Sequence, residues 1–325
     1  MAAYKVLIPQ EIAEEGKTYL RERGYEIKMG SGYSLEEIKK DVVDCDAIIA
    51  RLGLFTAEVL EAGKKLKVIA RHGVGVDNID VAKASELGIY VTNTPESNSN
   101  TVAELALGFI ISLARNLIAC DRAVRSDNFE FRNRKFGCDL EGKILGVLGV
   151  GKIGRRLSLK ANHGLSMKVI GYDPFVVADD FPSEVKRIRE RDELFSQSDF
   201  VSVHIPSTPE TKKSIGMREF KLMKPGAFFI NVARGDLVIE EDLIKALQEG
   251  VIAGAGLDVY EQEPPPKNYP LLTLENVILT PHNASLTKEC MIRMAVQAAQ
   301  GIDEVLSGKE PTWPVNRLGT STIKN

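Results

Sequence analysis

The feature that most constrains the fold is the stretch from Lys143 to Asp173. It begins with an apolar run, 144–148, whose composition is that of a strand buried in a parallel sheet. Three glycines in the spacing G-x-G-x-x-G follow, and a segment with apolar residues at helical spacing comes next. A second apolar run, 168–172, ends at Asp173. This order of strand, glycine turn, helix, strand and acid predicts a βαβ unit with a phosphate-binding turn.

Each glycine of the turn has a physical reason. Gly149 allows a sharp turn after the strand, and Gly151, which lacks a Cβ, lets a pyrophosphate approach the backbone. Gly154 lets the helix pack close to the strand. The helix N-terminus then presents N–H groups to the phosphates. Asp173 lies 19 residues after Gly154, where an acid accepts hydrogen bonds from the adenosine ribose hydroxyls, so the stretch predicts a dinucleotide site.

The same acid indicates which dinucleotide binds. The Asp173 carboxylate would repel the additional phosphate of NADP, and no Arg or Lys occurs at 174–177 to accept that phosphate. We therefore expect NAD as the cofactor.

Composition excludes several classes of partner. A length of 325 residues predicts two domains, and a net charge of -3 provides no basic field for nucleic acid. No apolar run reaches the roughly 18 residues of a membrane span, and the N-terminus enters a strand without an apparent signal peptide. The four cysteines are scattered, so we expect reduced thiols, no metal site and a cytoplasmic protein.

The chain order predicts an α/β fold with two doubly wound parallel sheets. Residues 1–98 alternate strand and helix and have no phosphate turn. Six strands are predicted over 144–279, the count of a full nucleotide-binding domain. Because the last helix, 285–306, follows a complete sheet, we expect it to return to the first domain. A substrate domain of 1–98 completed by 286–325 would thus enclose a Rossmann domain of 99–285 in the sequence.

Three local predictions accompany this plan. Residues 99–118 predict one long helix that is apolar on most of its circumference. Such a helix serves equally well as a domain bridge, a subunit contact or plain core. Residues 119–142 are polar and basic and indicate a connecting segment. Thr56 is predicted to cap a helix that ends at Glu61.

Ligands bind at the carboxyl ends of the strands in doubly wound sheets. Polar or glycine-rich groups follow almost every apolar run, which favours a functional site over a purely structural protein. These groups are Arg51, Arg71, His72, Gly73, Val74, Gly75, Asn98, His204, Arg234, Asp258, Glu263 and His282.

Three of these residue types together suit the reduction of a 2-oxo acid. A histidine such as His282 transfers protons near neutral pH, and a carboxylate held against it fixes its tautomer and favours the imidazolium. The guanidinium of Arg234 can clasp a carboxylate and polarise a neighbouring carbonyl. By residue type alone, Glu261 competes with Glu263 as the partner of the histidine.

Structural roles remain open for the same residues. Arg234 can instead form an ion pair with Glu240 or Glu241. His72 and His204 suit polar groups that satisfy the backbone beside the site, and His163 suits a helix surface. These alternatives follow from residue type and position in the chain.

The chain resembles the D-isomer-specific 2-hydroxyacid dehydrogenases over nearly its full length. The matching segments are RHGVGVDNID (71–80), NTPESNSNTVAELALG (93–108), LEGKILGVLGVGKIGRRL (140–157), VSVHIPSTPET (201–211), MKPGAFFINVARGDLVIEEDLIKAL (223–247), GLDVYEQEPP (256–265) and ILTPH (278–282).

The resemblance implies a catalytic trio of Arg234, Glu263 and His282. It selects Glu263 because the family's glutamate directly precedes proline. It also implies that backbone N–H groups near 73–75 bind the substrate carboxylate, that the cleft lies between the domains, and that the chain dimerises around 101–118. The implied cofactor contacts are Gly149, Gly151, Lys152, Ile153, Gly154, Asp173, His204, Thr208, Val232, Ala233, Asp258 and His282.

The sequence departs from the family pattern directly after the histidine. The family commonly has P-H-x-G, whereas Pro281-His282-Asn283-Ala284 occurs here. Alanine is tolerated where φ is negative, so the histidine's role should survive. Asn283 is an alternative contact for the nicotinamide amide.

The run 93–99 and Arg51 resemble the phosphoglycerate dehydrogenase-like branch of the family. Arg132, Arg134 and Lys135 add positive charge that can reach a phosphate from a neighbouring subunit. These residues predict 3-phosphoglycerate and phosphohydroxypyruvate as the substrate pair. Glycerate with hydroxypyruvate, or glyoxylate, is the alternative, and Arg51 would then bind a carboxylate. No regulatory domain is expected after the last helix.

A binding module of a different class shares this fold, namely the NAD-sensing transcriptional corepressors. Such proteins recruit partners through flexible tails. The intact trio and the lack of a long tail favour the enzyme.

Overall fold

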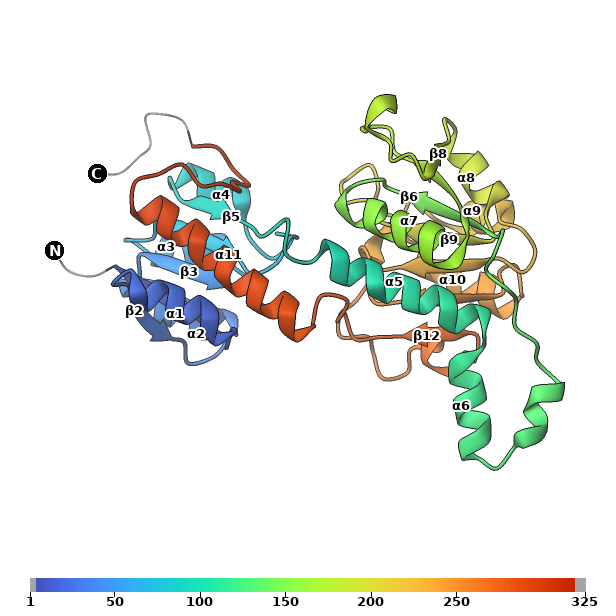
Figure 1. Cartoon of the computed structure of the whole chain (residues 1–325). Helices are drawn as coiled ribbons and strands as arrows, with labels where there is room; N and C mark the ends of the chain where they lie inside the picture. Colours follow the sequence, from blue (N-terminus) through green and yellow to red (C-terminus); the bar gives the residue numbers. More distant parts are fainter. Residues whose placement is uncertain (1–3, 319–325) are drawn as a thin grey trace. The chain divides into compact units, whose positions relative to one another are not determined.

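The computed structural model describes residues 4–318 and divides into two compact units (Figure 1). Unit 1 combines the chain up to Asn98 with the chain from Ser285 onward. Unit 2 is Ser99–Ala284. All strand pairs in both units are parallel, as the alternation of strands and helices predicts.

Unit 1 contains a five-stranded sheet in the order β2-β1-β3-β4-β5. This is the flavodoxin-like arrangement, so the doubly wound fold expected for this part of the chain is confirmed. The strands are β1 (Lys5–Ile8), β2 (Glu26–Met29), β3 (Ala47–Ala50), β4 (Val68–Arg71) and β5 (Tyr90–Thr92).

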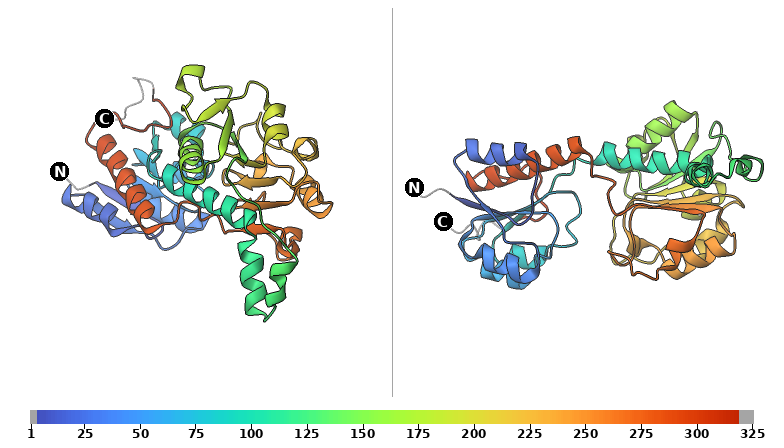
Figure 2. Two further views of the ribbon diagram at one scale, coloured as in Figure 1. Left: turned by 45° about the vertical axis from the view of Figure 1, so that its right-hand side comes forward. Right: turned by 90° about the horizontal axis from the view of Figure 1, so that it is seen from below.

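Helices cover both faces of this sheet (Figure 2). On one face α1 (Glu14–Glu22) and α11 (Lys288–Leu306) lie side by side, and a Cβ added at Gly16 would lie 2.7 Å from the Cβ of Ala295. The last helix therefore belongs to unit 1 although it follows the second sheet in sequence. The other face is covered by α2 (Leu35–Asp41), α3 (Ala57–Ala62) and α4 (Val81–Glu86).

Two helix starts in unit 1 differ from the prediction. Thr56 occupies the N-cap position of α3, but its hydroxyl makes no hydrogen bond in the described part of the chain, so the predicted side-chain cap is wrong. The short helix α4 was not predicted. Its N-cap is Asp80, whose carboxylate accepts a hydrogen bond from the N–H of Lys83 at 2.9 Å.

Unit 2 contains a seven-stranded sheet in the order β12-β11-β10-β9-β6-β7-β8. The first six strands along the chain follow the nucleotide-binding order 3-2-1-4-5-6, and β12 adds one edge strand. The predicted count of six was wrong because β8 has two charged residues among three and forms no apolar run. The strands are β6 (Ile144–Leu148), β7 (Lys168–Tyr172), β8 (Val185–Arg187), β9 (Phe200–Val203), β10 (Phe228–Asn231), β11 (Gly254–Leu257) and β12 (Val277–Leu279).

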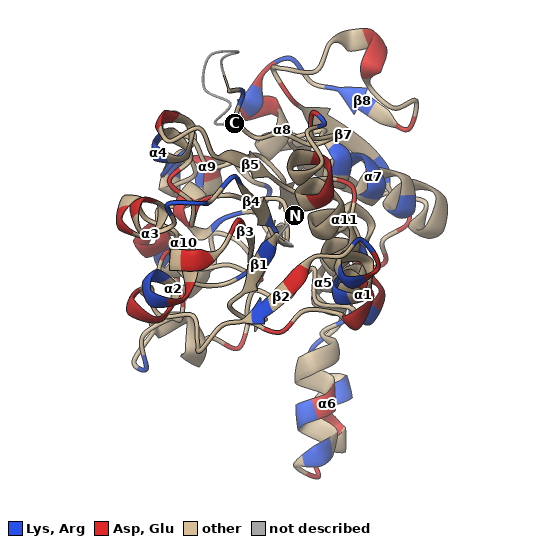
Figure 3. Ribbon diagram, turned by 90° about the vertical axis from the view of Figure 1, so that its left-hand side faces the viewer, with Lys and Arg blue, Asp and Glu red and all other residues tan. Residues whose placement is uncertain are grey.

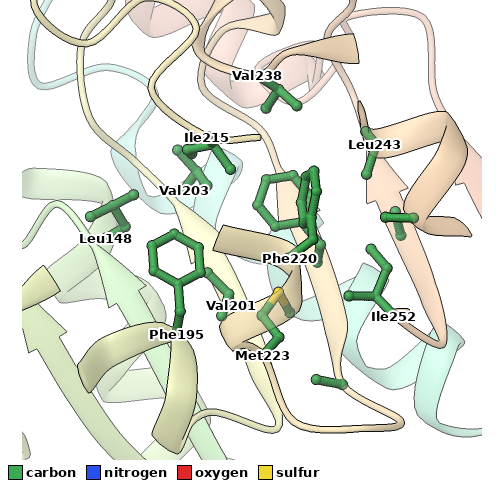
Figure 4. Packing of buried hydrophobic residues seen from close by; sticks show 14 of the residues in the cluster. Leu148, Phe195, Val201, Val203, Ile215, Phe220, Met223, Val238, Leu243 and Ile252 are labelled. Atoms are coloured by element: carbon green, nitrogen blue, oxygen red, sulfur yellow. The ribbon is translucent and has the colours of Figure 1, made fainter. Parts of the chain in front are cut away.

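Separate hydrophobic clusters cover the two faces of this sheet. The cluster shown in Figure 4 joins the sheet to three helices, and the rings of Phe220 and Phe229 meet edge to face at 5.4 Å. Those helices are α8 (Arg191–Gln197), α9 (Met217–Leu222) and α10 (Glu240–Gln248). The opposite face carries α5 (Ser99–Ala114) and α7 (Lys152–Leu165). Short 3-10 turns η1 (Val42–Asp44), η2 (Phe129–Asn133), η3 (Ala178–Asp180), η4 (Gly235–Leu237) and η5 (Pro270–Thr273) complete the elements.

The long helix predicted over 99–118 ends earlier than expected. Asn116 adopts a left-handed conformation, with φ 51°, and α6 (Leu117–Arg125) leaves at 61° from α5. The returning chain caps the break, because the N–H of Cys138 donates to the Ala114 carbonyl at 2.8 Å. The predicted connecting segment therefore begins within α6. Across residues 4–318 no single helix is long and apolar enough to span a bilayer, whereas α5 and α6 pass that test only as a bent pair.

Candidate active site

The glycine turn follows β6 directly. Gly149 has φ 97°, and a Cβ there would lie 2.8 Å from the carbonyl carbon of His204. A Cβ at Gly154 would lie 2.2 Å from the carbonyl oxygen of Gly149. These two positions therefore admit no side chain, for the reasons of turn and close packing that the sequence indicated.

Gly151 has the opposite environment. A Cβ at Gly151 would meet nothing within 4 Å, so the space in front of the first turn of α7 is open. Gly151 is the N-cap of this 14-residue helix and provides no side-chain cap. The first N–H groups of a helix have no intrahelical acceptor, and they attract anions. This arrangement fits a pyrophosphate.

Asp173 joins the glycine turn to the loop after β7. One carboxylate oxygen accepts the N–H of Val150 and the other accepts the N–H of Phe175, both at 2.9 Å. A carboxylate offers about four acceptor positions, so further hydrogen bonds from a ribose remain possible. The acid is thus fixed in orientation beside the turn.

The other predicted cofactor contacts lie at the carboxyl ends of β9 and β10. The backbone of His204 packs against Gly149, and its Nε2 lies 2.9 Å from the Ser202 hydroxyl. Burial of the imidazole lowers the pKa of His204 to about 3. His204 is therefore neutral at physiological pH. Thr208 closes a turn through the Thr211 hydroxyl at 2.7 Å. Val232 is buried and Ala233 is half-buried directly after β10.

An imidazole and a carboxylate meet in the loops that follow β11 and β12. The Nδ1 atom of His282 lies 2.6 Å from Oε2 of Glu263, while Oε1 of Glu263 accepts the N–H of Tyr260 at 3.1 Å. Burial raises the pKa of Glu263, but the hydrogen bond and charge of His282, the Tyr260 amide and the charge of Arg234 outweigh it. The pKa of Glu263 is therefore lowered.

The ionised carboxylate decides the imidazole tautomer. Glu263 can only accept, so Nδ1 of His282 carries the shared proton and Nε2 is left to exchange a proton with a ligand. The His282 side chain is 48% exposed, so Nε2 is accessible. Glu261, the competing residue, pairs with Lys213 at 2.8 Å instead.

The backbone at His282 is strained. Its φ is 49°, in the left-handed region that non-glycine residues rarely adopt. The buried carboxylate of Asp258 holds the loop on both sides, because it accepts the Thr280 hydroxyl at 2.5 Å and the N–H groups of Asn283 and Ala284 at 2.9 Å each. Ala284 does not have a positive φ, so glycine is not required there. Asp258, which was predicted as a cofactor contact, holds the His282 loop through these three hydrogen bonds.

Arg234 follows β10 and precedes η4. Its Nη1 donates to the Ala233 carbonyl at 2.7 Å, and its charge helps to lower the pKa of Glu263. The adjacent Gly235 is packed against the loop of the carboxylate, since a Cβ at Gly235 would lie 2.0 Å from the carbonyl carbon of Tyr260. The structure therefore brings the segments of Arg234, Glu263 and His282 together within unit 2.

The remaining predicted residues form a loop in unit 1. The carbonyls of Gly73, Val74 and Gly75 accept hydrogen bonds from Thr94, Asn93 and Arg71, respectively. The Gly73 N–H donates to the Arg71 carbonyl. Among the described residues, the N–H groups of Val74 and Gly75 have no protein acceptor.

Arg51, Arg71 and His72 lie in the segments next to this loop, and of these three side chains, as the structure describes them, only that of Arg71 is hydrogen-bonded to it. The guanidinium of Arg71 links the 73–75 loop to β3, because it donates to the carbonyls of Gly75 at 2.7 Å and Ala50 at 3.0 Å. Arg51 donates to the Glu11 carbonyl at 2.9 Å. His72 is buried, and burial followed by the charges of Arg51 and Arg71 lowers its pKa to about 4.

Sequence reasoning missed Tyr260. Its N–H binds Glu263 and its hydroxyl donates to the Thr280 carbonyl at 2.8 Å. A tyrosine in a loop after a strand has no residue-type signal for such a role, and only the folded loops reveal it.

A doubly wound sheet with a glycine turn and a following acid defines a dinucleotide-binding α/β protein. Residues 107–284 match a family model described as the NAD binding domain of D-isomer specific 2-hydroxyacid dehydrogenases. The chain belongs to the D-isomer specific 2-hydroxyacid dehydrogenase family, as the resemblance of its motifs predicts.

Its relatives have two different names. D-3-phosphoglycerate dehydrogenase of Methanocaldococcus jannaschii is 40% identical over 97% of this chain and 61% of that protein. Glyoxylate reductase of Korarchaeum cryptofilum is 39% identical over 96% of each chain. The solved structure of a glyoxylate reductase from Paecilomyes thermophila matches with a TM-score of 0.87 and 29% identity, covering 97% of this chain and 99% of that one. The chain spans 50–61% of the length of three phosphoglycerate dehydrogenases that it matches.

Proposed function

We propose that the protein is an NAD-dependent oxidoreductase that transfers a hydride between the cofactor and C2 of a D-2-hydroxy acid or 2-oxo acid. The observation that carries this proposal is the 2.6 Å contact between His282 and Glu263, beside Arg234 and in the same unit as the glycine turn. When bound, the nicotinamide supplies or accepts the hydride.

The protein's own groups bind the acid and move the proton. The Arg234 guanidinium binds the substrate carboxylate and polarises the C2 carbonyl. His282 donates the Nε2 proton to the C2 oxygen during reduction and takes it back during oxidation. Glu263 holds Nδ1 of His282 and stabilises its charged form. In this proposal Arg234 binds and polarises the substrate, His282 transfers the proton, and Glu263 orients His282.

Unit 1 carries candidate anion-binding groups of its own. The N–H groups of Val74 and Gly75 are available as donors, while the three carbonyls of the loop are occupied. Successive backbone N–H groups of this kind bind carboxylates. We therefore assign them to the carboxylate of the substrate.

NAD is the preferred cofactor in this proposal. The open space at Gly151 fits the pyrophosphate and the fixed carboxylate of Asp173 fits the ribose hydroxyls. The same carboxylate disfavours the phosphate of NADP through like charge.

For the substrate, we favour 3-phosphoglycerate and phosphohydroxypyruvate. Support comes from the relatives named D-3-phosphoglycerate dehydrogenase and from Arg51, whose guanidinium retains donors beyond its bond to Glu11. Reduction of glyoxylate is the second candidate, because a relative with that name matches over 96% of its own length.

A panel of 2-oxo acids tests the function. Purified protein is mixed with NADH and with phosphohydroxypyruvate, hydroxypyruvate, glyoxylate or pyruvate, and absorbance of NADH is followed. We expect turnover of at least one acid and a loss of about 10³-fold or more in kcat for His282→Gln. The absence of turnover with every acid would overturn the proposal.

The same panel tests the phosphate assignment through Arg51→Ala. We expect kcat/KM for phosphohydroxypyruvate to fall about tenfold more than kcat/KM for hydroxypyruvate, because a charged hydrogen bond is lost only with the phosphate. An equal loss for both acids would assign Arg51 to a group that the two substrates share.

We also propose a homodimer in the cytosol. The segment formed by α6 and the residues after it exposes several large apolar side chains. These are Leu117, Ile118, Val124, Phe129 and Phe136. Acidic and basic positions also occur along α6 (Figure 3). Light scattering should give twice the chain mass of 35.7 kDa. The four cysteines are free thiols, which suits the reducing cytosol.

A further inference from the structure

Tyr260 contacts the segments of all three residues proposed to carry out the reaction. Its N–H binds Glu263, its hydroxyl binds the Thr280 carbonyl two residues before His282, and its backbone adjoins Gly235, next to Arg234. We propose that the Tyr260 hydroxyl is a positioning group that fixes the His282 loop against Glu263. This inference rests on the proposed function of His282.

The backbone of Tyr260 orients the carboxylate. Its N–H donates a hydrogen bond to Oε1 of Glu263 at 3.1 Å. The other carboxylate oxygen, Oε2, can therefore face Nδ1 of His282, which lies at 2.6 Å. A Cβ at Gly235 would lie 2.0 Å from both the carbonyl carbon and the carbonyl oxygen of Tyr260, so the peptide after Tyr260 is confined from that side. The carboxylate therefore has one orientation set by the main chain.

The phenol acts on the histidine through a shared carbonyl. The Thr280 oxygen accepts the Tyr260 hydroxyl at 2.8 Å and also the N–H of His282 at 3.0 Å. The latter bond closes the tight turn in which His282 adopts φ 49°. A conformation disfavoured for a residue with a Cβ persists only where its surroundings hold it. The hydroxyl of Tyr260 fixes the carbonyl on which this turn closes.

The tyrosine is itself firmly held. Its side chain packs in the hydrophobic cluster of unit 2, and its ring meets Tyr269 edge to face at 6.1 Å. Burial, and then the charges of Asp258 and Glu263, raise the pKa of Tyr260 to about 12. The phenol therefore stays protonated and remains a donor at every pH at which the enzyme would work.

Tyr260→Phe removes the hydroxyl and keeps the ring and the N–H to Glu263. We expect kcat for the best acid of the panel to fall about tenfold, with KM for the acid and for NADH changed less than twofold, because one hydrogen bond that orients the proton donor is lost. Thermal unfolding is measured in parallel to show that the variant is folded.

A spectroscopic readout tests the position of the histidine without any activity. With ¹⁵N-histidine, the Nδ1 proton of His282 is identified by its loss in His282→Gln. We expect this signal to be protected from exchange in the native protein and to shift and exchange faster in Tyr260→Phe. If no acid is turned over, the proposed function fails, and this signal alone decides the positioning role.

Tyr269→Phe is the matched control, because it removes a hydroxyl from the same ring pair without a bond to the His282 loop. It should keep kcat within twofold and leave the Nδ1 signal unchanged. The inference is overturned if Tyr260→Phe leaves both kcat and the Nδ1 signal as in the native protein. It is also overturned if the two variants have equal effects, since the cause would then be packing of the ring pair.

Discussion

At the scale of one residue, the carboxylate of Asp173 has a structural task, and we propose that it also selects the cofactor. Its oxygens accept the N–H groups of Val150 and Phe175, so its charge is fixed beside the glycine turn. Asp173→Asn keeps the shape and removes the charge. We expect the preference for NADH over NADPH, measured as the ratio of kcat/KM values, to fall about tenfold because repulsion of the additional phosphate is lost.

A nearby acid provides the control for this change. Asp179 is exposed in η3, and Asp179→Asn alters charge in the same segment of unit 2 without a contact to the glycine turn. Its cofactor preference should stay within twofold of the native value. If kcat/KM fell equally for NADH and NADPH in Asp173→Asn, the residue would only stabilise the glycine turn.

The local environment of a residue was predictable where steric need limits the residue type. The three glycines follow from steric need, and their environments show a filled space at Gly149 and Gly154 but an open one at Gly151. Residue type alone left Glu261 and Glu263 equivalent, and only the family resemblance favoured the one that the structure places 2.6 Å from His282. The contact of Tyr260 with Thr280 joins two loops that are distant in sequence, so no local pattern encodes it.

At the scale of elements, buried strands were the most predictable feature because both faces of a parallel sheet are covered and their sequences become apolar runs. The exception, β8, lies at an edge and has two exposed charged residues. The bend between α5 and α6 depends on the left-handed Asn116 and on the distant Cys138 that caps it. Apolar periodicity does not record such a tertiary contact.

The contact of α1 with α11 gives a prediction about packing. A Cβ at Gly16 would lie 2.8 Å from the backbone of Ala295, closer than such atoms approach. We expect Gly16→Ala to lower the free energy of unfolding by about 1–3 kcal/mol, because overpacking outweighs the helical preference for alanine. Urea denaturation measures the change.

Gly164→Ala is the opposite case. Gly164 lies in α7, and a Cβ there would meet nothing within 4 Å. The free energy of unfolding should rise by about 0.4–1 kcal/mol, because alanine restricts the unfolded chain and favours the helix. A stabilising effect at both glycines would mean that α1 and α11 can separate without cost.

At the scale of the whole molecule, unit 2 is inserted in unit 1, and the sequence indicated this order because a last helix follows a finished sheet. His72 is buried, whereas His204 is half-buried. His72 lies in unit 1 and His204 in unit 2. The single tryptophan, Trp313, belongs to unit 1, so its fluorescence reports the unfolding of that unit.

Acid should destabilise unit 1 through His72. The pKa of His72 is lowered from 6.5 in the unfolded chain to about 4 in the native state. Between these two values the unfolded chain binds a proton at His72 and the native state does not. This difference in proton binding does not destabilise the native state at pH 7 and above, and the destabilisation grows as the pH falls towards 4. Between pH 7 and pH 5 the free energy of unfolding of unit 1 should fall by about 2 kcal/mol, at 1.36 kcal/mol per pH unit of difference. Urea titrations followed by Trp313 fluorescence at the two pH values measure this loss.

Two variants separate this effect from general acid sensitivity. His72→Gln cannot take up the proton, so its free energy of unfolding by Trp313 fluorescence should differ little between pH 7 and pH 5. His163→Gln replaces an exposed histidine in unit 2 and should retain the native loss of about 2 kcal/mol. The carboxylates titrate mostly below this range, so they do not obscure the comparison. If His72→Gln lost as much stability as the native protein, the buried His72 would not be the group that resists protonation.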